Sequence, residues 1–187
     1  MKTFQDLLDA GITFELFGPR ITPHDIAQLE SELNYKLPEQ YRDYLLYANG
    51  GDLDKHMTED DNGYYFLIKW PESFAHLFPD DDGNLFAYFH ALDNSQPFND
   101  PAVTTLRYGM VTWPFRPKGT LHIANTAGGG DFILLGLGEH NYGKIILWRL
   151  VGTNRVESPD VAAVAYETVL ADSFVDFILS LRPASEI

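Results

Sequence analysis

A histidine and a carboxylate on neighbouring segments are the residues of this chain best suited to acid–base chemistry. His122 and Asp131 lie in or beside two short apolar segments whose composition predicts strands. An imidazole within hydrogen-bonding distance of a carboxylate can act as a general base, so a small hydrolase using His122 and Asp131 is one hypothesis. A hydrogen-bonded histidine in a structural role is the interpretation that we favour.

Other patterns of catalysis and metal binding are missing from the sequence. The chain contains no cysteine, which excludes thiolate zinc sites and cysteine nucleophiles, and no two histidines lie three or four residues apart, so we expect no metal ion and no cofactor. A run of three glycines could approach a phosphate closely, but Asp131 follows it where a phosphate loop has a lysine. We interpret Gly129, Gly130 and Asp131 as a bulge or tight backbone crossing that enters a strand.

Acidic residues outnumber basic ones by 27 to 13, which gives a formal net charge of −14. This charge argues against nucleic acid or an anionic membrane as a ligand and favours a basic protein partner. Residues 52–63 and 79–84 are predicted to be exposed acidic loops, and neither has the ligand spacing of an EF-hand. The candidate partner-binding residues are Asp52, Asp54, Glu59, Asp60, Asp61, Asp80, Asp81 and Asp82. The alternative is that the acidity serves only solubility.

The helix that precedes the first of these loops has strong local signals for its start, its buried face and its end. Pro38 suits the first turn of a helix, where its missing N–H costs no hydrogen bond. The apolar residues that follow recur at three- and four-residue steps, which places them on one helical face. That face consists of Tyr41, Tyr44, Leu45 and Ala48. The helix is predicted to end at residues that tolerate positive φ, namely Asn49, Gly50 and Gly51.

Further helices are predicted towards both chain ends. They cover residues 3–10, residues 22–34, and a closing segment capped by Asp172 or Ser173. Strands are predicted over residues 64–70, 121–124, 132–135 and 144–150, the last two as an antiparallel hairpin, whereas 85–92 and 161–170 fit either a strand or a helix. This grouping predicts a single α+β domain over residues 1–187, with helices from both chain ends packed against a central, largely antiparallel mixed sheet.

The Pro38 helix resembles the signature of the SUKH superfamily, the Smi/Knr-type domain. Residues 37–51 match its pattern Leu-Pro-x-x-Tyr-x-x-aromatic-Leu, followed by Asn-Gly-Gly. Three further segments agree in order, namely the helix entered at Ile21, the glycine-rich strand entry and the closing helix, so the resemblance covers residues 21–181. The positions that carry it, all of them structural, are Leu37, Pro38, Tyr41, Leu45, Asn49, Gly50, Gly51, Gly129, Gly130, Asp131, Asp172, Ser173 and Phe174.

This superfamily is known for bacterial immunity proteins that neutralise toxins and for a fungal regulator of cell-wall assembly. The resemblance therefore implies a non-catalytic protein-binding domain, and the first hypothesis is an immunity protein against a cognate toxin, for which a basic, nuclease-type protein is one candidate. The alternative is an intracellular scaffold or signalling adaptor. We expect a cytoplasmic protein, because the sequence shows no signal-peptide pattern and no apolar run long enough to span a membrane. The residues alone specify no oligomeric state.

Overall fold

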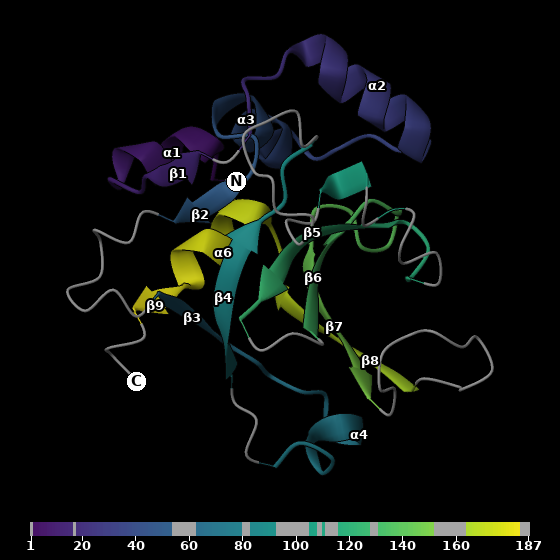
Figure 1. The fold of residues 1–187 in the computed structure, drawn as a ribbon. Helices are drawn as coiled ribbons and strands as arrows, with labels where there is room; N and C mark the ends of the chain where they lie inside the picture. The colour runs from purple at the N-terminus through teal and green to yellow at the C-terminus, as the bar shows by residue number, and fades with distance from the viewer. Residues whose placement is uncertain are drawn as a thin grey trace.

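The computed structural model describes residues 2–16, 18–53, 63–79, 83–92, 105–107, 110, 116–127, 131–151 and 164–183. Within these ranges the frame of the molecule is one nine-stranded sheet, drawn in Figure 1. Its strands are β1 (Phe14–Leu16), β2 (Gly51–Leu53), β3 (Tyr64–Leu67), β4 (Gly83–Phe89), β5 (Thr120–Thr126), β6 (Asp131–Gly136), β7 (Ile145–Val151), β8 (Val164–Ala171) and β9 (Arg182–Pro183). The helices are α1 (Phe4–Asp9), α2 (Pro23–Leu33), α3 (Glu39–Tyr47), α4 (Glu72–Ala75) and α6 (Phe174–Ser180).

The sheet is antiparallel at every pairing between the described strands. Its main path runs β1-β2-β4-β5-β6-β7-β8, and β3 joins β4 to β9 beside that path. The predicted hairpin is formed by β6 and β7, with Ile133 opposite Leu147. Figure 1 shows the sheet curling around α6. The predicted α+β class and largely antiparallel sheet are confirmed.

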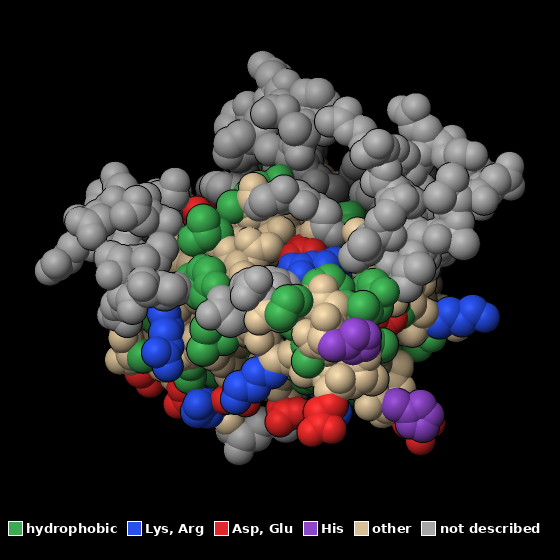
Figure 2. All heavy atoms as spheres, turned by 90° about the horizontal axis from the view of Figure 1, so that it is seen from below, with side chains coloured by type: hydrophobic (Ala, Val, Ile, Leu, Met, Phe, Trp, Pro, Cys, Tyr) green, Lys and Arg blue, Asp and Glu red, His purple; other side chains and the backbone are tan. Residues whose placement is uncertain are grey.

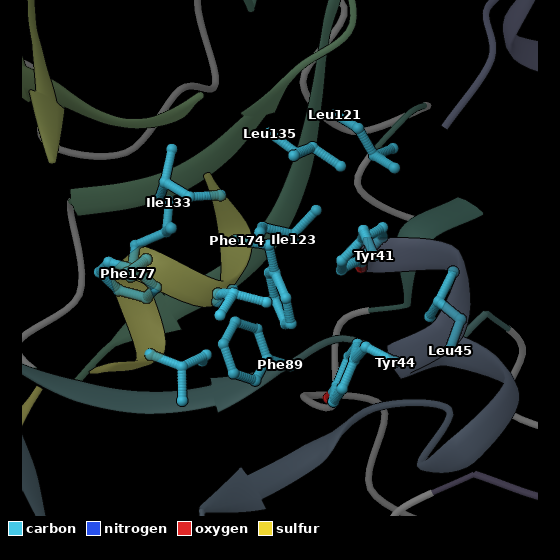
Figure 3. Packing of buried hydrophobic residues seen from close by; sticks show 14 of the residues in the cluster. Tyr41, Tyr44, Leu45, Phe89, Leu121, Ile123, Ile133, Leu135, Phe174 and Phe177 are labelled. Atoms are coloured by element: carbon cyan, nitrogen blue, oxygen red, sulfur yellow. The ribbon is translucent and has the colours of Figure 1, made fainter. Parts of the chain in front are cut away.

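Helices from both ends of the chain pack together over the sheet, as predicted. Tyr44 of α3 lies with its ring centroid 4.9 Å from that of Phe174 of α6 and 5.2 Å from that of Phe89 of β4. Figure 3 shows these rings in one cluster with Ile123 and Leu135, which belong to strands in the middle of the sheet. Because each partner comes from a distant part of the sequence, this aromatic core joins the chain ends to the centre.

The helix ends follow the predicted local signals. Thr22 caps α2, since its hydroxyl accepts a hydrogen bond from the Asp25 N–H, and Asn34 ends the same helix at a φ of 57°. Ser173, and not Asp172, caps α6, because the Ser173 Oγ accepts from the Asp176 N–H at 3.1 Å. Pro38, expected in the first turn of the helix, instead occupies the N-cap position directly before Glu39.

Several sequence-based boundaries need correction. Residues 52 and 53 were expected in an exposed loop, but both belong to β2, and Leu53 is buried. Gly83 and Asn84, expected in the second acidic turn, begin β4. The two ambiguous segments are strands β4 and β8, because long-range pairing decides between conformations that the local pattern leaves open. Strand β1 and helix α4 are too short to have been recognised.

Candidate functional site

The Asn-Gly-Gly motif at the end of α3 joins the helix to the sheet. The Asn49 side chain is buried, its Nδ2 donates to the Pro19 carbonyl at 2.7 Å, and its Oδ1 accepts from the Leu92 N–H at 2.9 Å. Gly50 has a φ of +86°, and a Cβ there would lie 2.5 Å from the Ala91 backbone nitrogen. These residues are therefore required for the close approach of two backbones, and the motif has a structural role.

A buried glutamate that sequence reasoning missed fixes the start of α3. Glu30 of α2 is 4% exposed, and its carboxylate accepts from the Leu37 N–H at 3.0 Å and from Lys36 Nζ at 2.6 Å. Gln40 ties the same helix end to both chain termini, since it donates to the Lys2 carbonyl and accepts from the Val175 N–H. A buried charge of this kind is stable only when it is paired, which fixes the geometry around it.

The two tyrosines of the motif contribute packing. Tyr41 and Tyr44 are fully buried, and no hydrogen-bond partner for either phenol oxygen is found within the described ranges. Burial in apolar surroundings raises the pKa of both phenols well above the usual value. Both groups therefore stay neutral at physiological pH and cannot serve as bases.

Asp131 is held in a buried ion pair. Its carboxylate accepts from Arg149 Nε at 2.6 Å and from Asn84 Nδ2 at 2.9 Å. The Arg149 guanidinium lies 5.1 Å from the ring centroid of Trp70 and 5.2 Å from that of Phe78. Both carboxylate oxygens of Asp131 and the guanidinium of Arg149 therefore already have partners within the fold.

His122 forms a different buried pair, with His90 as its partner. The two Nε2 atoms lie 3.2 Å apart, and the His122 Nε2 also lies 3.0 Å from the Ala124 carbonyl oxygen. Because a carbonyl can only accept, His122 carries its proton on Nε2, and the His90 Nε2 faces it as an acceptor. Burial lowers the pKa of His122 to about 4, so the imidazole is neutral near pH 7.

The structure does not bring His122 and Asp131 together. In the β5–β6 ladder His122 lies opposite Leu134, and Asp131 is three residues from Leu134 along the same strand. Since side chains alternate between the faces of a sheet, His122 and Asp131 point to opposite faces. Each is also buried and bonded elsewhere, so the hypothesis of a hydrolase built on this pair is wrong.

The predicted acidic surface can be followed only in part. Asp52 lies in β2, opposite Glu15, and is partly exposed. The other candidate partner-binding residues lie outside the described residues, namely Asp54, Glu59, Asp60, Asp61, Asp80, Asp81 and Asp82. Gly129 and Gly130 also lie outside them. The placement of the acidic runs opposite a basic partner therefore stays a prediction.

A groove where the N-terminal ends of α1, α3 and α6 meet is the candidate binding feature that sequence reasoning missed. It has a volume of about 440 Å³, and its lining includes Phe4, Pro38, Glu39, Asp43, Tyr142 and Asp172. We call it the helix-end groove. In Figure 1 these three helices lie next to one another, far from α4. No local signal could have revealed the groove, because its walls come from residues more than 100 positions apart.

The end of the molecule around α4 has a different surface. Figure 2 looks at this end, where the described Lys and Arg side chains lie intermixed with Asp and Glu side chains.

Among the residues that the structure describes, no group of three or more His, Cys, Asp or Glu residues could hold a metal ion. None of the helices in the described ranges has the length and hydropathy that a transmembrane segment needs.

Comparison with known proteins agrees with this architecture. The chain is 26% identical over 161 residues to the SPbeta prophage-derived uncharacterized protein YokK of Bacillus subtilis (strain 168). The aligned segment covers 86% of this chain and 74% of YokK. The model of the SMI1 / KNR4 family (SUKH-1) matches residues 20–180, which include the α3 motif, the buried pairs of the sheet and the Ser173 cap. The chain therefore belongs to the SMI1 / KNR4 family (SUKH-1).

Proposed function

We propose that this chain is a non-catalytic immunity protein that binds and neutralises a protein toxin in the cytoplasm. The observation that carries the proposal is the family match over residues 20–180. The interior is consistent with it, because His122 and Asp131 are both used in structural pairs. The absence of cysteine suits a reducing compartment.

The charge of the chain supports a basic toxin as the partner. At a net charge of −14 the protein attracts cations over a distance set by the ionic strength, about 8 Å in physiological salt. Such attraction accelerates association more than it slows dissociation. The acidic runs, with Asp60 and Asp61 among them, are proposed to provide part of this attraction.

The experiment is capture followed by a growth assay. The tagged chain is incubated with lysate of its native cells at low and at high salt, and the bound proteins are identified by mass spectrometry. We expect one basic protein that is retained at low salt and released at high salt. Expressed alone, that protein should stop growth, and co-expression of this chain should restore it.

The controls separate the two parts of the proposal. Asp60→Asn combined with Asp61→Asn should slow association while leaving dissociation nearly unchanged, as surface plasmon resonance would show. An unchanged association rate would remove the contribution of this acidic run alone. Capture of several unrelated proteins, none of them toxic, would contradict the immunity role and favour the scaffold or adaptor.

A further inference from the structure

The helix-end groove combines an apolar floor with an acidic rim. Phe4 and Pro38 are buried at its base, and Glu39, Asp43 and Asp172 are exposed around it. Lys2 also lines the groove, and its Nζ is paired with Asp176 Oδ1 at 3.0 Å. The lining thus offers both apolar contact and negative charge to the same occupant.

The three rim carboxylates differ in their partners from three other carboxylates of the chain. Glu30, Asp131 and Asp176 are each paired with a cation. By contrast, the carboxylates of Glu39, Asp43 and Asp172 make no hydrogen bond or close ion pair to another residue in the described part of the chain, although Arg42 attracts the Asp43 carboxylate at longer range. The rim is therefore free to bind a cation from outside.

The position of Asp43 is not explained by helix stability. Glu39 lies in the first turn of α3, where the helix dipole favours a negative charge. Asp43 lies one turn further on, four residues after Glu39, and like charges at this spacing destabilise a helix. Partial burial and the charge of Glu39 raise the pKa of the Asp43 carboxyl, and the neighbouring Arg42 offsets this rise only in part. A bound cation would relieve both effects.

We propose that the helix-end groove receives an arginine side chain of the protein partner. The aliphatic part of the side chain packs on Phe4 and Pro38, and the guanidinium reaches Asp43 and Glu39. Tyr142 is 50% exposed at the rim and offers its ring for stacking. Arginine fits better than lysine because its planar cation both stacks on aromatic rings and binds carboxylates through several N–H groups. This inference rests on the proposed function only in taking the occupant from a protein partner.

The walls of the groove are fixed before binding. The turn that carries Tyr142 is closed by hydrogen bonds from Gly143 N–H to the Gly136 carbonyl at 2.9 Å and from Gly138 N–H to Asn141 Oδ1 at 2.9 Å. On the facing side, Gln40 bonds the backbone at Lys2 and at Val175. A preformed site loses little conformational entropy when it is filled, which favours binding.

The test needs no partner protein. The isotope-labelled chain is titrated with N-acetyl-arginine amide and, in parallel, with the uncharged isostere N-acetyl-citrulline amide, and amide shifts are followed by NMR. We expect saturable shifts at Thr3, Gln40, Tyr142 and Gly143 with the arginine probe, at millimolar concentration, and none with citrulline. The lysine analogue should bind more weakly.

Matched variants assign the binding to the groove. Asp43→Asn and Glu39→Gln should each weaken arginine binding at least about threefold. Glu72→Gln is the control, because Glu72 also begins a helix directly after a proline but lies in α4. Tyr142→Leu keeps an apolar side chain and removes the aromatic ring, so it should weaken arginine binding and abolish the preference over lysine. Thermal unfolding verifies that each variant is folded.

The outcomes separate this inference from the proposed function. Absence of saturable shifts in the groove, equal shifts with citrulline, or equal effects of Asp43→Asn and Glu72→Gln would overturn the groove as an arginine site. Equal affinity for the lysine analogue would overturn the assignment to arginine. A toxin neutralised by the chain together with a silent groove would refute the groove alone, whereas arginine binding without any toxic partner would refute the immunity role alone.

Discussion

The interior of the sheet and the helix-end groove use the same kinds of polar side chain in opposite ways. In the sheet, Asp131 is paired with Arg149 and His122 with His90, and all four are largely removed from solvent. At the groove, Asp43 and Glu39 are exposed and lack such partners within the described residues. The difference indicates that polar groups of the sheet stabilise the fold, while those at the helix ends are available for binding. Substitutions in the two regions should therefore affect different measurements.

The largest expected effect is on the buried ion pair. Arg149→Met leaves the Asp131 carboxylate buried without its cation, so it should lower the free energy of unfolding by about 3–5 kcal/mol. Urea denaturation measures this. Arg20→Met is the control, because Arg20 is exposed, and it should change stability by less than about 0.5 kcal/mol. Equal effects of the two substitutions would show that the ion pair contributes no special stability.

The histidine pair should make stability depend on pH. The unfolded chain binds a proton at His122 near pH 6.5, whereas the folded chain does so only near pH 4, so unfolding takes up a proton between these values. Stability should therefore be complete above pH 6.5 and fall by about 3 kcal/mol as the pH drops to 4. His122→Phe should remove most of this loss, while substitution of the exposed His140 by Phe should leave it. Urea denaturation at several pH values checks both, and equal pH profiles for the two variants would refute this role of His122.

The Asn49 side chain should contribute a smaller amount. Asn49→Ala leaves the Leu92 N–H and the Pro19 carbonyl without this partner and should cost roughly 2 kcal/mol or more. Asn34→Ala is the matched control, since Asn34 also has a positive φ but is exposed at the end of α2. Asn34→Ala should lose only the preference of asparagine for a positive φ, which lowers the free energy of unfolding by about 1 kcal/mol. If both variants unfold at the same urea concentration, the hydrogen bonds of Asn49 contribute nothing.

The groove variants should have the smallest effect on stability. Glu39→Gln and Asp43→Asn each remove one of two like charges on α3, so the free energy of unfolding should change by less than about 0.5 kcal/mol. The same variants are expected to weaken arginine binding. A loss of stability comparable to that of Arg149→Met would place these carboxylates among the structural residues and would remove the contrast between the two regions.

The sequence predicted the elements whose signals are local. Pro38, the Tyr41 face and the Asn-Gly-Gly ending specified α3 within one short segment, and Ser173 did the same for α6. Strand β8 was ambiguous because its composition fits either conformation and its pairing partner, β7, decides.

The candidate site could not be predicted, because it depends on which distant residues become neighbours in the folded chain. His122 and Asp131 were correctly placed on neighbouring strands, but the register that turns them to opposite faces is set by long-range pairing. The helix-end groove was missed for the same reason, since Phe4, Asp43 and Asp172 become neighbours only in the folded chain.

We infer that the helix-end groove, rather than the polar groups of the sheet, takes part in binding the partner. The most direct test compares three baits in capture from native lysate: the unchanged chain, the double variant Glu39→Gln with Asp43→Asn, and Glu72→Gln. Quantified by mass spectrometry, the basic partner should be strongly depleted on the double variant and fully retained on Glu72→Gln. Equal recovery on all three baits would contradict the claim.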